Sequence, residues 1–138
     1  MTLHFYRINI WAVLISIAAM MVIGALWYSP VLFGNVWLKL IGKKPEDISK
    51  RDGNNSMAFS IIPAIVQAVS LAFLFEFIHA TRIVDGLVIA SLVAIGFIMM
   101  NMLNLVLFEG RSMKLTLLNA GYPFVALNST AIILVIWQ

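Results

Sequence analysis

The sequence predicts an all-α membrane protein, a single domain of residues 1–138 in which four transmembrane helices form an up-and-down bundle. Hydrophobic residues make up 62% of the chain and charged residues only 11%, whereas charged residues are about a quarter of a soluble domain. The mean hydropathy is +1.00. Four stretches, each close to the roughly 20 apolar residues that cross a bilayer, are interrupted by one charge, Glu76. The predicted spans are residues 8–29, 57–78, 86–108 and 115–137.

The first span is expected to be retained in the mature protein. A signal peptide has a short apolar region and a small-residue cleavage site, whereas this apolar run continues unbroken to Pro30. Because Pro30 lacks a backbone donor and disfavours helical geometry at Ser29, the span should kink or stop there.

A short helix is predicted after this stop, because Phe33, Trp37 and Ile41 recur at helical spacing. Its tryptophan and its lysines suit a helix lying in the membrane interface. An extension of the first span that packs on its neighbours remains the alternative.

The rest of the loop, residues 34–56, is polar and is most simply a connector. Pro45 with two acidic residues after it predicts the first turn of a small helix. Residues 52–55 have the composition of a turn, and Ser56 is a plausible N-cap for the second span.

Lysine and arginine are distributed unequally between the two sides of the membrane. The loop of residues 34–56 and the turn of residues 109–114 together hold seven of them, whereas the termini and the central connection hold two. The positive-inside rule then predicts that the loop is cytoplasmic and that both termini are outside. The net charge of +3 therefore concerns orientation, and no nucleic-acid partner is expected.

Polar residues within the spans are expected to point inward, because hydrocarbon offers them no water. Asn101 and Asn104 are three residues apart, as are Asn119 and Tyr122, so each pair shares a helix face. At about 1.5 Å per residue, Asn104 and Asn119 each lie roughly 7 Å inside the cytoplasmic boundary. Trp27 and its neighbour reach a similar depth, which predicts one polar and aromatic layer. Helix–helix hydrogen bonding without any ligand is the alternative explanation of this layer.

Three motifs occur in order along the chain: Trp-Tyr-Ser-Pro-Val-Leu-Phe-Gly at residues 27–34, Phe-Glu-Gly-Arg at residues 108–111 after Asn104, and Asn-Ala-Gly-Tyr at residues 119–122. Together they resemble a family of small bacterial membrane proteins catalogued only as a domain of unknown function. The resemblance covers nearly the whole chain. It implies a four-helix protein of the bacterial inner (cytoplasmic) membrane with no assigned reaction, and it transfers no catalytic residue.

All three motifs fall at the predicted cytoplasmic ends of their spans, which favours a shared ligand site there. Arg111 is a candidate for holding a lipid phosphate bidentately, and the aromatic residues are candidates for an apolar or cation-binding wall. Glu109 and Arg111 are equally explained as ordinary charges in a tight turn. The candidate site residues are Trp27, Tyr28, Ser29, Phe33, Trp37, Asn101, Asn104, Glu109, Arg111, Asn119 and Tyr122.

Enzymatic chemistry is not expected, and neither is a cofactor. The chain has no cysteine, which excludes thiolate metal sites and cysteine nucleophiles. Glu76 and His79 form half of a carboxylate-bridged di-metal pattern whose other ligands are missing, and His4 adds only one more.

The predicted function is a non-enzymatic unit that binds or moves a lipid or lipophilic small molecule at the cytoplasmic side. Membrane lipids are the expected partners. Ala18, Ala19, Gly24 and Ala25 would permit close approach of helices in a homo-oligomer. The alternative is a structural accessory subunit that docks on a larger membrane complex.

Overall fold

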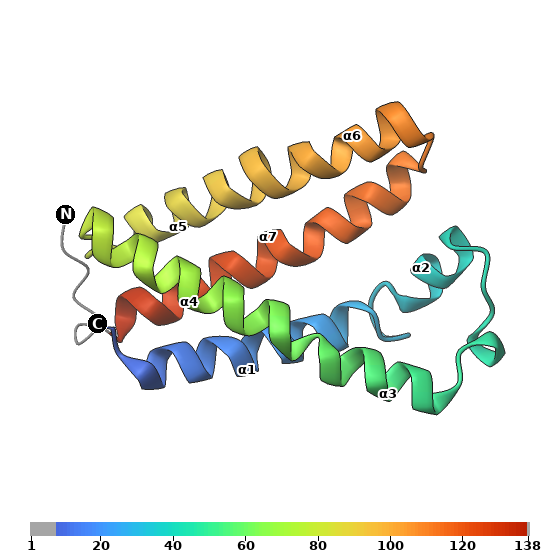
Figure 1. Cartoon of the computed structure of the whole chain (residues 1–138), viewed down its shortest axis with the longest axis horizontal. Helices are drawn as coiled ribbons and strands as arrows, with labels where there is room; N and C mark the ends of the chain where they lie inside the picture. The colour runs from blue at the N-terminus through green and yellow to red at the C-terminus, as the bar shows by residue number, and fades with distance from the viewer. Residues whose placement is uncertain (1–7, 138) are drawn as a thin grey trace.

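The computed structural model describes residues 8–137, and these form helices without any strand. Figure 1 shows the helices as one elongated bundle. The elements are α1 Ile10–Trp27, α2 Gly34–Leu40, the 3-10 turn η2 Pro45–Asp47, α3 Lys50–Phe59, α4 Ile61–Ile78, α5 Ile83–Leu92, the π-helical segment η3 Val93–Met99, α6 Met100–Glu109 and α7 Met113–Ile136.

Four helical segments within the described residues are long and apolar enough to cross a membrane. They confirm the predicted all-α fold class with four spans. The second helical segment begins at Lys50, before the predicted span of residues 57–78, because α3 and α4 follow each other with only Ser60 between them. The segments are Ile10–Trp27, Lys50–Ile78, Ile83–Glu109 and Met113–Ile136.

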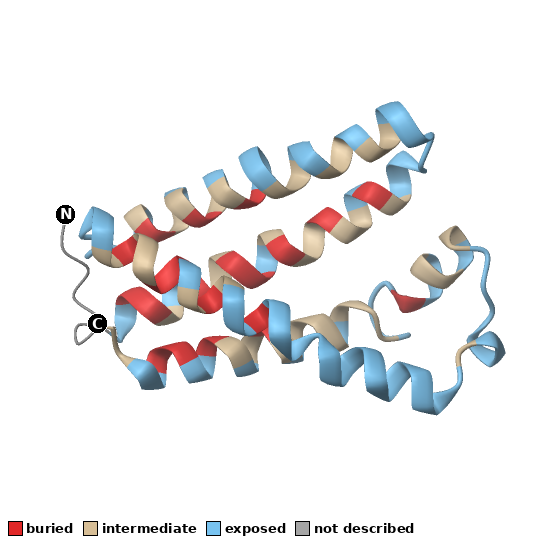
Figure 2. Ribbon diagram, in the orientation of Figure 1, coloured by how far each residue is buried: buried red, intermediate tan, exposed pale blue. Residues whose placement is uncertain are grey.

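The centre of the bundle is α7, which packs on α1 and on α5, while α4 packs mainly on α1. Figure 2 shows buried residues along most of the length of α7, whereas α3 is exposed throughout. Alanines such as Ala68, Ala90, Ala126 and Ala131 are fully buried. Small residues at the contacts let helix backbones approach closely, which is how helices associate without a hydrophobic driving force.

Hydrogen bonds fix the antiparallel register of α1 on α7. The Asn9 side chain caps α1 by accepting from the backbone N–H of Trp11, and its Nδ2 donates to the Trp137 carbonyl at 2.7 Å. Nearer the other end, the Tyr122 hydroxyl lies 3.4 Å from the Met20 carbonyl and donates to it. Gly24 is one of the small residues that were expected to permit close helix approach in a homo-oligomer. It packs on the Tyr122 ring, so its contact is with another helix of the same chain.

The predicted turn at residues 52–55 is wrong, because these residues lie inside α3. Ser49 is the N-cap: its hydroxyl accepts from the Asp52 backbone N–H at 3.1 Å. Asp52 also places a negative charge in the first turn, where the helix dipole favours it. Ser56 lies within this helix and caps nothing. The short helix after the first span is confirmed as α2, and Pro45 begins η2 as predicted.

The π-helical segment η3 changes the face that the third span presents. Gly86, Ala90 and Ala94 are buried, and in a continuous α-helix Asn101, nearly two turns after Ala94, would share their face. A π turn contains more residues than an α turn, so the inward face shifts along the sequence. Asn101 and Asn104 are consequently exposed, and the prediction that they point inward is wrong.

Candidate functional site

The first motif forms a compact turn between α1 and α2. The Ser29 hydroxyl donates to the Leu26 carbonyl at 2.7 Å. The Ser29 carbonyl in turn accepts from the backbone N–H groups of Leu32 at 3.2 Å and Gly34 at 2.8 Å. Helix α1 therefore ends at Trp27, as expected from the position of Pro30, and α2 begins at Gly34.

Gly34 is required by the closeness of this turn. A Cβ atom at this position would lie 2.6 Å from the carbonyl carbon of Ser29 and 2.7 Å from its oxygen. These are backbone atoms that the turn itself holds, so they cannot rotate away. The glycine that ends the motif therefore permits a backbone contact that no other residue allows.

The turn docks on α7 through Trp27. Its indole Nε1 donates to the Leu118 carbonyl at 3.1 Å. Its ring lies against Gly121 on one side, where an added Cβ would be 2.7 Å from Cζ2. The ring centroid of Phe33 lies 4.6 Å from that of Trp27.

Tyr28 continues the contact with α7. Its hydroxyl donates to the Asn119 side-chain oxygen at 3.1 Å. Its ring meets Trp37 edge-on at 5.4 Å between centroids and lies 6.0 Å from the ring of Tyr122. The first and third motifs are therefore one structural unit, in which α2 is held against α7.

The structure brings together seven of the eleven candidate residues: Trp27, Tyr28, Ser29, Phe33, Trp37, Asn119 and Tyr122. Asn101 and Asn104 are exposed on α6 and have no hydrogen-bond partner among the described side chains. None of the hydrogen bonds and ring contacts that hold the aromatic group involves either asparagine.

The remaining two candidates lie in the turn between α6 and α7. The Arg111 Nε donates to a Glu109 carboxylate oxygen at 2.9 Å, and about half of each side chain is exposed. Gly110 between them has a φ of 66°, which ends α6. An ion pair this exposed contributes little stability. The geometry matches charges in a tight turn more closely than a phosphate clamp.

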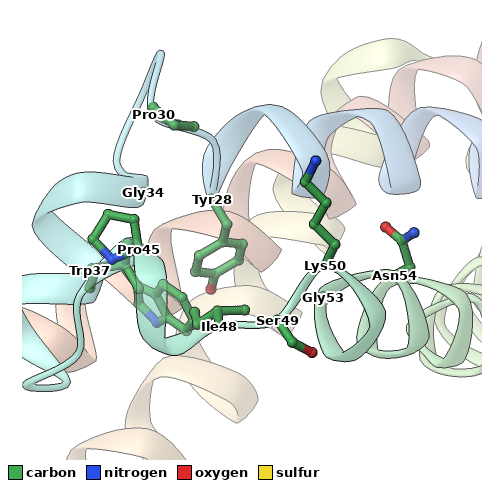
Figure 3. A pocket seen from close by; sticks show the side chains of 11 residues that line it. Tyr28, Pro30, Gly34, Trp37, Pro45, Ile48, Ser49, Lys50, Gly53 and Asn54 are labelled. Atoms are coloured by element: carbon green, nitrogen blue, oxygen red, sulfur yellow. The ribbon is translucent and has the colours of Figure 1, made fainter.

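A pocket of about 340 Å³ lies beside the aromatic group. Figure 3 shows Tyr28 between Trp37 on one side and Lys50 on the other. The α1–α2 turn, α2, η2 and the first turns of α3 all contribute to its lining. This volume is near the lower end of the range for small-molecule sites.

Among the described residues, Lys50 is the only charged one that lines this pocket. Ser49, Lys50 and Asn54 all come from the beginning of α3, where the helix dipole is positive. The Ser49 hydroxyl is occupied, because it donates to Asp52 at 2.7 Å. Lys50 and Asn54 therefore remain as the polar groups of this wall. Sequence reasoning missed them because it assigned residues 52–55 to a turn; the spacing of Ser49 and Asp52, typical of an N-cap, would have revealed the helix.

Metal ligands do not gather in the part of the chain that the structure describes, where no group of three or more histidine, aspartate or glutamate side chains could hold an ion. His79 has a φ of 52° and ends α4 in the left-handed conformation. His4, the further possible metal ligand, lies outside the described residues.

Four apolar helices, the loop helix α2 and the docked turn place this chain in the class of small multi-span α-helical proteins. A family model described as "Protein of unknown function (DUF1761)" matches residues 11–135. The chain belongs to this family, which confirms the predicted membership of a family of unknown function. No curated protein and no solved structure matches the chain.

Proposed function

We propose that the protein is a non-enzymatic lipid-binding unit of a bacterial inner membrane, and that it holds a phospholipid headgroup in the pocket beside Tyr28. The observation that carries this proposal is the two-sided character of the α1–α2 turn. Tyr28, Pro30 and Gly34 line the pocket, while Val31 and Leu32 of the same turn are 82% and 48% exposed. A headgroup in the pocket would thus have exposed apolar side chains beside it for its acyl chains.

The chemistry of the pocket supports an anionic group. Lys50 is the charge that would attract a phosphate, since ammonium groups near a membrane surface each contribute about 1 kcal/mol toward anionic lipid. The Asn54 amide is a donor on the same wall. The edges and faces of Tyr28 and Trp37 form the opposite, largely apolar wall.

Native mass spectrometry of the protein from phosphatidylglycerol nanodiscs tests the role of Lys50. The variant Lys50→Gln is expected to retain roughly 5-fold less phosphatidylglycerol, the equivalent of about 1 kcal/mol. Lys50 is exposed and makes no ion pair among the described residues, so the variant should fold normally. Retention of phosphatidylcholine should change little.

The matched control is Lys43→Gln, which removes an exposed lysine of the same loop that does not line the pocket. It is expected to retain phosphatidylglycerol as the unmodified protein does. Equal losses of phosphatidylglycerol in both variants would mean that general surface charge causes the effect. If Lys50→Gln lost none, the pocket would not be the lipid site. Copurification with other polypeptides and without lipid would favour the accessory-subunit alternative.

The proposal also requires that the pocket face the cytoplasm, where the seven lysines and arginines of the two connections should lie. A reporter that is active only in the cytoplasm is therefore expected to be silent when fused after Gln138 and active when inserted at Gly42. Gly42 lies in an open turn after α2, and no atom lies within 4 Å of a Cβ placed there. The reverse pattern of signals would contradict this orientation.

A further inference from the structure

Four exposed residues form a line along the outer side of the third span. Phe97, Asn101, Asn104 and Phe108 follow one another at intervals of four, three and four residues. Within α6, Asn101, Asn104 and Phe108 have the spacing of the contact positions in a coiled coil, and Phe97 lies in the π-helical segment just before them. The two phenylalanines are 73% and 86% exposed, and both asparagines are exposed between them.

The two amides lie within the membrane-spanning part of the helix. Asn101 and Asn104 precede Glu109, the end of α6, by eight and five residues, or about 12 and 7 Å at roughly 1.5 Å per residue. An amide in hydrocarbon without a hydrogen-bond partner is unfavourable. Polar residues in spans accordingly face protein or a water-filled cavity.

Within residues 8–137, no side chain provides a hydrogen-bond partner for the two asparagines of this line. Among the described elements, α6 packs mainly on α7, apart from its own continuation from η3, and Figure 1 shows it at the edge of the bundle. The pocket beside Tyr28 has no residue of α6 in its lining. The outward face of α6 is therefore available to another helix.

We propose that a second copy of this chain covers this face, and that α6 pairs with α6 of the partner about a two-fold axis along the membrane normal. All copies insert with the same orientation, so such an axis makes the two helices parallel and places identical residues at identical depths. An asparagine amide both donates and accepts, so Asn101 is complementary to the partner's Asn101 at its own level.

The two amides at fixed depths on this face favour a second copy of the chain as the partner over lipid or an unrelated helix. Acyl chains offer no hydrogen bond, and an unrelated helix would need two amides at the same two depths. Asparagine at one contact position is also known to fix register in parallel helix pairs. The flanking phenylalanines would pack on their counterparts above and below the amides. This inference stands independently of the lipid pocket.

Disulfide cross-linking in native membranes tests the contact, because the chain has no cysteine of its own. The variant Phe108→Cys is expected to give an oxidised product of twice 15.4 kDa. The control Phe59→Cys carries its cysteine at a residue that is 70% exposed on α3, and it should stay monomeric. Equal yields from the two variants, or a cross-link from Phe108→Cys to a different polypeptide, would overturn the proposal.

A second measurement tests the amides themselves. The double variant Asn101→Leu with Asn104→Leu is expected to weaken dimerisation in lipid roughly 10-fold, because leucine packs as well on lipid as on another leucine. Ser70→Leu, which replaces an exposed polar residue on α4, should leave dimerisation unchanged. Dimerisation that survives in the double variant would contradict an amide-mediated contact.

Discussion

The variant Gly34→Ala is expected to lose about 3 kcal/mol of the free energy of unfolding. The added Cβ would lie 2.6 and 2.7 Å from backbone atoms of Ser29, and it would also meet the Tyr28 carbonyl oxygen. Relief requires opening the turn, which breaks the Gly34 N–H bond to the Ser29 carbonyl, 2.8 Å long in the native protein. Reversible unfolding by SDS in mixed micelles measures this loss.

Gly53→Ala is the matched control for this loss. Gly53 lies inside α3, and the nearest atom to a Cβ there is the Ile48 side chain at 3.9 Å. Alanine is about 0.5–1 kcal/mol more favourable than glycine within a helix, so this variant should be as stable as the native protein or more so. If Gly34→Ala were equally well tolerated, the tight turn at residues 29–34 would not exist as described.

Composition and charge placement were sufficient to predict the fold class. A membrane span must be long and apolar, and the charge-free stretches satisfy both conditions directly. The stop after Trp27 was also predictable, because Pro30 acts locally. Depth arithmetic placed Trp27 and Tyr28 near the level of Asn119, and in the structure Tyr28 donates to Asn119. These features depend on local sequence or on distance along a regular helix.

What could not be predicted depends on departures from regular geometry. The π segment at Val93–Met99 consists of apolar residues and one glycine, a composition that is equally compatible with an α-helix. Its wider turn shifts the inward face along the sequence, and Asn101 and Asn104 after it are exposed. One wall of the pocket comes from α3, and this helix was not predicted. The turn-like composition of residues 53–55 outweighed the N-cap signal of Ser49 in the sequence. Met57 and Ala58 after them are helix formers, and α3 continues to Phe59, next to the second span.

The second large effect is expected at Gly121, where alanine should destabilise the protein by roughly 2 kcal/mol. Its Cβ would lie 2.7 Å from Cζ2 and 3.1 Å from Cη2 of Trp27. The indole has little freedom to withdraw, because its Nε1 is bonded to the Leu118 carbonyl and Phe33 packs on it. The same unfolding measurement applies. Gly96→Ala, at a site with no atom within 4 Å of a Cβ, is the control and should lose much less.

A compensating variant distinguishes this steric cause from a general weakening of α7. Trp27→Phe removes the part of the indole that faces Gly121, together with the hydrogen bond to Leu118. Combined with Gly121→Ala, the smaller ring leaves room for the new methyl group. The double variant should therefore lose less stability than the two single variants added together, because residues in direct contact are energetically coupled. Strict additivity would mean that α7 is weakened at Gly121 for a reason unrelated to Trp27, and the docked turn would then not be held by this contact.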